Sequence, residues 1–270
     1  MQHFSRSKTI FVKLNKLGRN FLPFIKELES NVVKYIDIQQ SFIDYDGSDI
    51  IETVTDGAYI TLLDRYGNLF YDNVDIRNFT PGYYLGQRKL IDRKLVLQNC
   101  FIECTTSWMI GKVVAITFYW EEKKFSSLIG TEKTSKELVE LLLAPSQSRT
   151  VVTQIKFPDI RNIAGKKIRS IRPQYLTNET ITPLGYNTLP QNSDVQSSVY
   201  LTLANGNTIL VDSLNLLSML DVWQLTPLFF DNLIVNFPDS YITVVVQYGE
   251  GATLPTETLS IPLQIEYLED

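Results

Sequence analysis

Cysteine and histidine are scarce in this sequence, with two cysteines and one histidine in 270 residues. If Cys100 and Cys104 lie on one strand, they are roughly 13 Å apart, and a disulfide needs Cα atoms within about 7 Å. We therefore expect two buried thiols. Two thiols and the lone His3 are too few ligands for a structural zinc site, and a single terminal histidine argues against a histidine-based catalytic triad.

Long apolar runs and enzyme motifs are also missing. No uncharged apolar stretch of about 18 residues occurs, so we expect no membrane-spanning helix. Residues 1–20 mix charged with apolar residues and lack the apolar centre of a signal peptide, which favours assembly in a cytoplasm. The chain contains no G-x-S-x-G, P-loop or H-E-x-x-H motif, and we expect neither an enzyme nor a bound cofactor.

Basic residues are absent from the last third of the chain. All 25 Lys and Arg lie at or before Arg172, while residues 173–270 contain eleven Asp and Glu. Because lysine commonly guards exposed strand edges, its absence favours edges that are covered or paired with neighbours. A polar face made of Thr and Asn would explain the same absence equally well. A nucleic-acid groove is therefore not expected in the C-terminal half of the chain.

The one basic cluster, residues 161–172, directly precedes this region. Period-two alternation along it would place Arg169 and Arg172 on opposite faces of a strand. We expect a solvated or subunit-contacting strand here. An acidic partner, or nucleic acid held at low affinity, is the alternative.

Alternating apolar and polar residues, rich in β-branched and aromatic types, dominate the chain. This pattern predicts many short strands separated by turns, as in a sandwich or barrel. We predict strands at residues 9–14, 32–43, 58–63, 68–72, 94–104, 112–120, 150–157, 166–176, 198–203, 207–211, 232–237, 240–248 and 259–268.

Two helices are predicted among these strands. Thr134 is followed three residues later by Glu137, as in a capping box, and Pro145 ends the apolar segment that follows. This pattern predicts a helix over 134–144. A second, shorter helix is predicted after Asp212, which would be its N-cap.

The chain is therefore expected to be mainly β, with two tandem antiparallel β-sandwiches, jelly-roll-like, joined by a short helix and linker. The first domain spans 1–145 and includes the helix, and the second spans 146–270. Two sandwiches of this size fit the length of the chain.

Two hairpins, one in each half, suggest an internal repeat. Tyr-Ile-Thr-Leu at 59–62 matches Tyr-Leu-Thr-Leu at 200–203, and Asp72 matches Asp212. The order of elements around them is shared, with 32–43 corresponding to 166–176. Ser107-Trp108 and the strand after it would correspond to Ser240-Tyr241 and the strand after those. A duplicated sandwich explains these matches.

The best metal-like run is "DYDGSD", with Asp44, Asp46 and Asp49 around a glycine. Calcium prefers clustered carboxylates on a tight loop. The spacing departs from that of an EF-hand, and an acidic loop without metal is the preferred interpretation.

Aromatic residues mark two candidate subunit interfaces, because aromatics are enriched where proteins contact each other. Tyr83 and Tyr84 lie in "NFTPGYYLG", and Trp223, Phe229 and Phe230 lie in or beside "QLTPLFF". Both segments combine Pro with large apolar side chains.

The paired segments "AYITLLDRYGNLFYD" (58–72) and "VYLTLANGNTILVD" (199–212), with the apolar strands 112–120 and 240–248, carry a family resemblance. The chain resembles double jelly-roll capsid proteins of icosahedral viruses and phages. The resemblance implies a structural virion protein that self-assembles into trimeric capsomers, with itself and other virion proteins as partners. It implies no specific nucleic acid and a location in the virion. The departure from the family is that eight clean strands cannot be counted in each half.

Two alternatives stay open. A different sandwich pair would suit a phage neck, tail or fibre component. A non-catalytic binding or adhesin module would carry an exposed aromatic platform or a calcium site, and the mass of the particle in solution separates it from an assembly protein.

Overall fold

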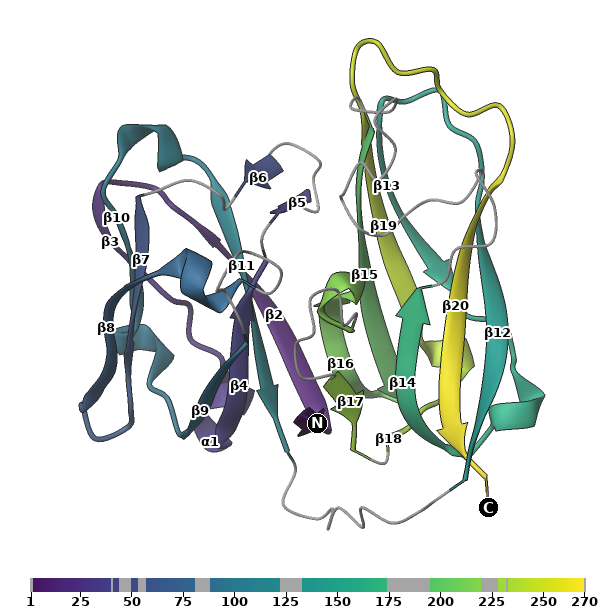
Figure 1. Ribbon diagram of the computed structural model, residues 1–270, viewed down its shortest axis with the longest axis horizontal. Helices are drawn as coiled ribbons and strands as arrows, with labels where there is room; N and C mark the ends of the chain where they lie inside the picture. The colour runs from purple at the N-terminus through teal and green to yellow at the C-terminus, as the bar shows by residue number, and fades with distance from the viewer. Residues whose placement is uncertain are drawn as a thin grey trace.

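The molecule consists of two β-sandwiches side by side (Figure 1). The computed structural model describes residues 2–39, 41–43, 50–52, 57–80, 88–121, 133–173, 195–219, 228–231 and 233–269. The first sandwich is built from β2 (Arg6–Lys13), β3 (Gly18–Phe21), β4 (Val33–Ile38), β7 (Ala58–Leu63), β8 (Leu69–Asp75), β9 (Lys89–Arg93), β10 (Phe101–Cys104) and β11 (Val113–Trp120).

The second sandwich is built from β12 (Thr134–Leu143), β13 (Thr150–Lys156), β14 (Lys167–Pro173), β15 (Val195–Asn205), β16 (Thr208–Asn215), β18 (Leu233–Ile234), β19 (Tyr241–Tyr248) and β20 (Leu259–Leu268). Four short strands form two small extra sheets: β1 (Gln2–Phe4) with β17 (Leu228–Phe230), and β5 (Ser41–Ile43) with β6 (Ile50–Glu52). The helical elements are α1 (Lys26–Ser30), η1 (Ile76–Phe79), η2 (Leu97–Asn99), η3 (Ser107–Met109), η4 (Arg161–Ile163), η5 (Leu216–Met219) and η6 (Phe237–Asp239).

Both halves have the strand order of a jelly roll. Among the described residues, the first half pairs its eight sandwich strands as β2-β11-β4-β9 and β3-β10-β7-β8. The second half pairs its eight as β12-β20-β14-β18 and β13-β19-β15-β16. Numbered along the chain within each half, both give one sheet in the order 1-8-3-6 and one in the order 2-7-4-5, the arrangement of two interlocked Greek keys. Eight strands can therefore be counted in each half, which the sequence pattern did not resolve.

The two sandwiches share one sheet. β16 pairs in parallel with β2 through Val211–Ser7 and Asp212–Lys8, which joins one sheet of each half into an eight-stranded sheet. The Lys8 ammonium lies 3.2 Å from the Asp212 carboxylate at this contact. Figure 1 shows β2 and β16 between the two sandwiches. The halves are thus joined by backbone pairing as well as by the linking chain.

The N-terminal strand crosses into the second half. β1 pairs in parallel with β17, placing Phe4 opposite Phe230. The Phe4 side chain is fully buried within the second hydrophobic core. Its ring makes edge contacts with Tyr119 at 5.0 Å and with Phe230 at 5.2 Å between centroids. Residues 2–4 therefore help to hold the sandwiches together.

The helix predicted at 134–144 is a strand. β12 pairs with β20 along its whole length, from Thr134 opposite Leu268 to Leu143 opposite Leu259. Val139, Leu141 and Leu143 are buried while the residues between them are exposed, which is period two and not 3.6. The second sandwich consequently begins at β12, before the predicted boundary at 145, and the described residues contain no linker helix.

The prediction of a helix directly after Asp212 is also wrong for residues 213–215, which belong to a strand. β16 continues to Asn215, and only Leu216–Met219 turn into the short 3₁₀ helix η5. Each predicted strand range overlaps an observed strand. Among the described residues, no helix is long and apolar enough to cross a membrane.

The two hairpins that suggested a repeat occupy equivalent places. β7–β8 and β15–β16 are the fourth and fifth strands of their jelly rolls. In each, a threonine hydroxyl accepts a backbone N–H from a residue with positive φ: Thr61 from Asn73 at 3.1 Å, and Thr202 from Ser213 at 3.4 Å. The pairing register shifts at both points, so the same β-bulge occurs in both halves.

Cys100 and Ser240 are a further equivalent pair. The Cys100 sulfur accepts the N–H of Leu63 at 3.3 Å and donates to the carbonyl four residues earlier. The Ser240 hydroxyl accepts the N–H of Ala204 at 3.0 Å and donates to the carbonyl four residues earlier. Cys100 and Cys104 are both buried and not disulfide-bonded, as predicted. They do not lie on one strand, because residues 97–99 form η2, Cys100 ends that turn and only Cys104 belongs to β10.

This equivalence corrects the match of Ser107-Trp108 with Ser240-Tyr241. β19 corresponds in strand order to β10, and β11 corresponds to β20. The sequence match was shifted by one strand because two strongly apolar strands resemble each other wherever they stand in the order.

Candidate functional site

A cluster of buried polar side chains lies where the two jelly rolls meet. Ile36 and Ile38 of β4 point into the first core, so alternation turns Asp37 and Gln39 toward the opposite face. Asp37 is fully buried there. Its carboxylate accepts hydrogen bonds from the Tyr119 hydroxyl at 2.8 Å, from Arg88 Nε at 3.3 Å and from Gln39 Nε2 at 3.2 Å.

The cluster is completed by the second jelly roll. Arg88 donates to the backbone carbonyl of Ser218 in η5 at 2.8 Å, and Gln39 donates to the Ser218 hydroxyl at 3.4 Å. The Arg88 guanidinium also lies over the Tyr119 ring, 5.2 Å from its centroid. Polar groups of both jelly rolls are therefore bonded to one another in the joint.

Burial dominates the electrostatics of this cluster. It raises the pKa of Asp37 above its ordinary value, and the nearby Arg88 charge only partly opposes that rise. Burial also raises the pKa of the Tyr119 phenol, with the Asp37 charge adding to the effect. The arrangement is an ion pair embedded in hydrogen bonds, which suits a fixed joint between domains.

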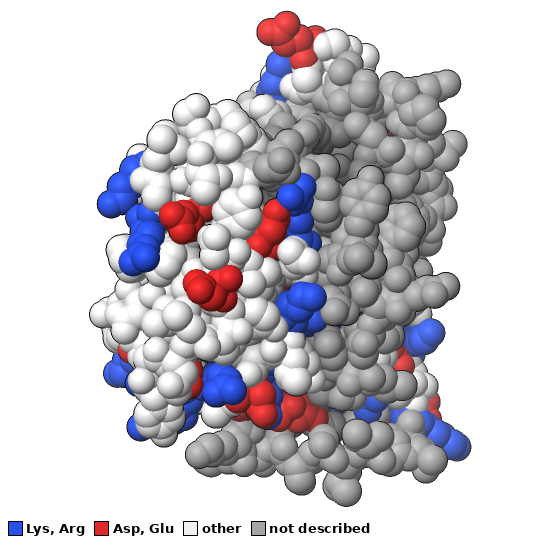
Figure 2. All heavy atoms as spheres, turned by 60° about the vertical axis from the view of Figure 1, so that its left-hand side comes forward, with Lys and Arg blue, Asp and Glu red and all other residues white. Residues whose placement is uncertain are grey.

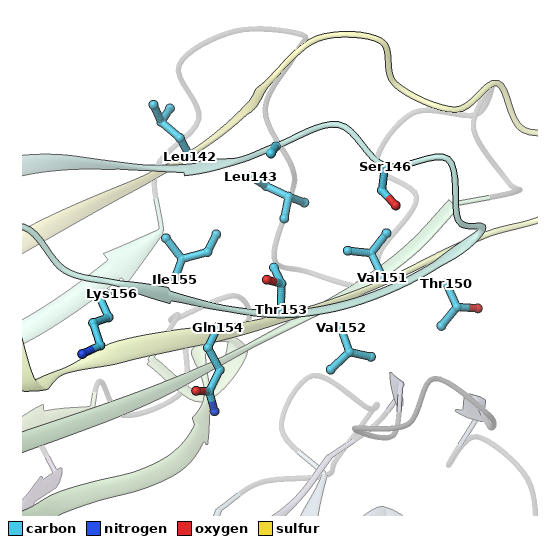
Figure 3. Close-up of a pocket in the computed structure, with 11 residues that line it drawn as sticks. Leu142, Leu143, Ser146, Thr150, Val151, Val152, Thr153, Gln154, Ile155 and Lys156 are labelled. Atoms are coloured by element: carbon cyan, nitrogen blue, oxygen red, sulfur yellow. The ribbon is translucent and has the colours of Figure 1, made fainter.

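A second feature is the open edge of the second jelly roll, where no further described strand lies beside β12 or β13. β12 and β13 are consecutive in the chain and stand at the ends of their two sheets. Between them lies a groove of about 590 Å³, lined by Leu142, Leu143, Ala144, Ser146 and residues 150–156. Figure 3 shows Val151, Thr153 and Ile155 pointing toward β12, and Val152 and Gln154 pointing away.

The lining is mostly uncharged. Lys156 is the one charged residue among those that line the groove. Val151, Thr153 and Ile155 are only half-buried, although corresponding positions of the neighbouring β19 are fully buried. The interior of the sandwich is therefore partly exposed at this edge.

The predicted interface residues have different positions. Phe230 is fully buried against Phe4, so it belongs to the core and offers no surface to another subunit, because pairing of β17 with β1 turns it inward. Phe229 is half-buried, with the guanidinium groups of Arg169 and Arg172 at 5.8 and 5.2 Å from its ring centre. Tyr83, Tyr84 and Trp223 lie outside the described residues.

The basic cluster does not alternate as predicted. The register of β14 with β20 shifts between Ile168 and Ser170, and Arg169 and Arg172 both stack against Phe229. A bulge changes the face on which later side chains lie. The sequence pattern contains no signal for it.

The candidate calcium ligands Asp44, Asp46 and Asp49 also lie outside the described residues. Within the described part of the chain, no group of three His, Cys, Asp or Glu is placed to hold a metal ion.

The first jelly roll exposes an aromatic surface on its outer sheet. Phe21 is 56% exposed, and its ring lies 5.7 Å from that of Phe101 on the neighbouring strand. Arg19 covers the Phe101 ring at 4.6 Å. Figure 2 shows charges of both signs scattered among wide uncharged areas on the side of the first jelly roll that faces the viewer.

Sequence reasoning missed the joint and the open edge. Asp37 stands between two isoleucines in a predicted strand. Because the isoleucines face the core, Asp37 must face the other side of the sheet. A charged residue at such a position indicates that an oppositely charged partner covers that side. The open edge was hidden because β12 was predicted as a helix.

Comparison with protein-family models, with curated proteins and with solved structures gave no match to this chain.

Proposed function

We propose that this chain is a structural virion protein, a double jelly-roll capsid subunit that assembles with copies of itself in a host cytoplasm. The observation that carries the proposal is the strand order, since both halves pair as 1-8-3-6 and 2-7-4-5. Jelly rolls occur in viral capsids and also in lectins and cupins, so the tandem arrangement carries more weight than either half alone.

The joint supports this function. A shell subunit transmits contacts between neighbours best as a rigid body. Here the eight-stranded sheet, the insertion of Phe4 and the bonds from the Asp37–Arg88 cluster to Ser218 connect the two jelly rolls by three independent means. Two similar sandwiches held in this way give each subunit two similar halves. Three subunits would therefore place six similar sandwiches around an axis and form a pseudo-hexagonal trimer.

The second jelly roll supplies surface suited to assembly. Its strands β15, β16, β19 and β20 contain no Lys or Arg, and the outer edges of β12 and β13 have no strand beside them among the described residues. Each of these two edge strands carries one exposed lysine, Lys136 in β12 and Lys156 in β13. Their remaining length is open to pairing with a strand of another chain. Other virion proteins are the further partners that the proposal implies.

The test is the particle formed by the purified chain. Sedimentation velocity and negative-stain electron microscopy across a range of protein concentrations are expected to reveal a trimer or a larger assembly. A chain that stays monomeric at every concentration would contradict the proposal.

The aromatic surface of Arg19, Phe21 and Phe101 favours a second candidate, a glycan-binding or adhesin module. Stacking of a sugar on an exposed ring would use the free face of Phe21. A monomer whose glycan binding is lost in Phe21→Ala would establish this candidate in place of the capsid subunit.

A further inference from the structure

The outer edge of β13 has a defined hydrogen-bonding pattern. Just beyond its ends, Tyr248 N–H donates to the Arg149 carbonyl at 2.7 Å, and Phe157 N–H donates to the Ser240 carbonyl at 3.1 Å. Each pair lies directly opposite in the register of β13 with β19. Because bonded and non-bonded pairs alternate in antiparallel sheets, the odd-numbered residues of β13 bond to β19. The backbone groups of the even-numbered residues point to the open edge.

One of these even-numbered residues already has a partner. Ser148 Oγ accepts the Thr150 N–H at 3.3 Å and donates to the Thr150 carbonyl at 2.6 Å. For Val152, Gln154 and Lys156, no described residue bonds to the outward groups. Within the described part of the chain, a short row of outward donors and acceptors therefore has no strand beside it.

The side chains of the same strand favour an extended partner. Val151 and Ile155 face the groove and are half-buried, while Val152 on the other face is 44% exposed. A strand laid along β13 would cover the groove-facing pair and satisfy the free backbone groups. This is the geometry of strand addition to a sheet edge.

We propose that the β13 edge pairs with the β13 edge of a second copy, antiparallel about a two-fold axis at Thr153. In this register Val152 lies opposite Gln154 of the other copy, and these residues exchange both N–H···O bonds. Val151 comes opposite Ile155 on the groove side, and the two Thr153 side chains meet at the axis.

The charge pattern of the strand fits a second copy. Lys156 is the only charged residue in β13, and the symmetric register places it opposite Thr150, so no like charges face each other. A two-fold axis along the sheet normal keeps the inner faces of both sheets on the same side. The two eight-stranded sheets would then continue into one another.

This contact deepens the proposed assembly function and rests on it. A trimer uses a head-to-tail contact between different surfaces, whereas the β13 contact is isologous. It therefore joins subunits of neighbouring trimers.

Cysteine crosslinking of the full-length chain tests the register. Opposite residues of a non-hydrogen-bonded pair have Cα atoms about 4.5 Å apart, within disulfide range. We expect Thr153→Cys to form a covalent dimer on mild oxidation. Ile155→Cys is the matched control, because residue 155 would lie roughly 13 Å from its own copy. If both variants crosslink equally, the β13 contact is wrong. If neither variant crosslinks although the wild type associates, the contact is also wrong. In both cases the assembly proposal still stands.

A proline variant tests the same edge without cysteine. Gln154→Pro removes an outward N–H and no bond to β19. We expect it to keep the native circular dichroism spectrum and any trimer, and to lose the larger species seen by sedimentation velocity. Unchanged association in this variant overturns the contact. A wild-type chain that is monomeric at all concentrations overturns both the contact and the proposed function.

Discussion

Replacing Arg88 with methionine is expected to weaken the joint between the jelly rolls. Methionine keeps most of the apolar stem but removes the charge. The Arg88 guanidinium is 3.3 Å from the Asp37 carboxylate, and the side chains of Arg88 and Asp37 are 7% and 0% exposed. The variant therefore leaves an almost completely buried carboxylate without its cation.

The magnitude follows from this burial. Removing one partner of a buried ion pair costs about 3–5 kcal/mol. A Coulomb attraction at about 4 Å and an effective dielectric constant of about 20 gives roughly 4 kcal/mol, which is consistent. Because whole domains are stable by about 5–15 kcal/mol, the loss is a large part of the total.

The loss depends on pH with a defined sign. The pKa of Asp37 is raised above its ordinary value of 3.8 by burial, so the folded chain binds the proton more tightly than the unfolded chain. The contribution of this group to stability is complete below 3.8 and is lost as the pH rises through the folded-state pKa. Without Arg88 that pKa rises further. The difference between variant and wild type is therefore largest at neutral pH and narrows on acidification.

Urea unfolding at pH 7 and pH 5 measures this difference. Arg161→Met is the matched control: Arg161 Nε lies 3.5 Å from Asp159, but the two side chains are 88% and 61% exposed. We expect the control to have no measurable effect, because exposed pairs are screened by water. If Arg88→Met costs no more than Arg161→Met at pH 7, the buried ion pair does not stabilise the joint. A cost that grows on acidification would contradict the sign derived from the raised pKa of Asp37.

Three further changes test other parts of the fold. Phe4→Ala is expected to lower the free energy of unfolding by about 3–5 kcal/mol, because it opens a cavity in the second core. Phe24→Ala is the control and is expected to lower it far less, since the Phe24 side chain is 56% exposed. Equal losses in urea unfolding would refute the insertion of the N-terminal strand. Burial raises the pKa of Cys100 to about 11, so a thiol reagent at pH 8 is expected to label it only after unfolding, and labelling of the native protein, located by mass spectrometry, would contradict its buried position. Ser213→Asn is expected to raise the free energy of unfolding by less than about 1 kcal/mol, because asparagine tolerates the positive φ of this bulge better; a loss of stability would argue against the strain.

The repeat is the part of the fold that local sequence predicted best. In both hairpins a Tyr-x-Thr-Leu strand is followed by a turn and an aspartate, and Thr61 and Thr202 then bond to equivalent bulges. These contacts join residues close in the chain, so the pattern determines them with little help from the rest of the fold. The buried thiols were predictable for a similar reason, since Cys104 lies on the short apolar strand β10 and Cys100 directly precedes that strand.

β12 shows where local information failed. Its Thr, Glu, Lys and Leu residues favour a helix and a capping box, yet β20 provides a partner along its whole length. Ten consecutive strand pairings and the burial of alternate residues outweigh a helix propensity of a few tenths of a kcal/mol per residue. The partner lies more than 100 residues away, so no window of sequence contains it.

The sequence alone determined that the chain is mainly β, that one hairpin recurs in each half, and where most of the strands lie, because alternation and turn residues act over short distances. The shared order of strands in the two halves became clear only from the sheet pairing. Only the tertiary structure decided that Asp37 and Phe230 are buried, that Arg169 and Arg172 share Phe229, and that β13 keeps an open edge. Each of these depends on which distant strand covers a face or an edge, and that choice is made by packing of the whole fold.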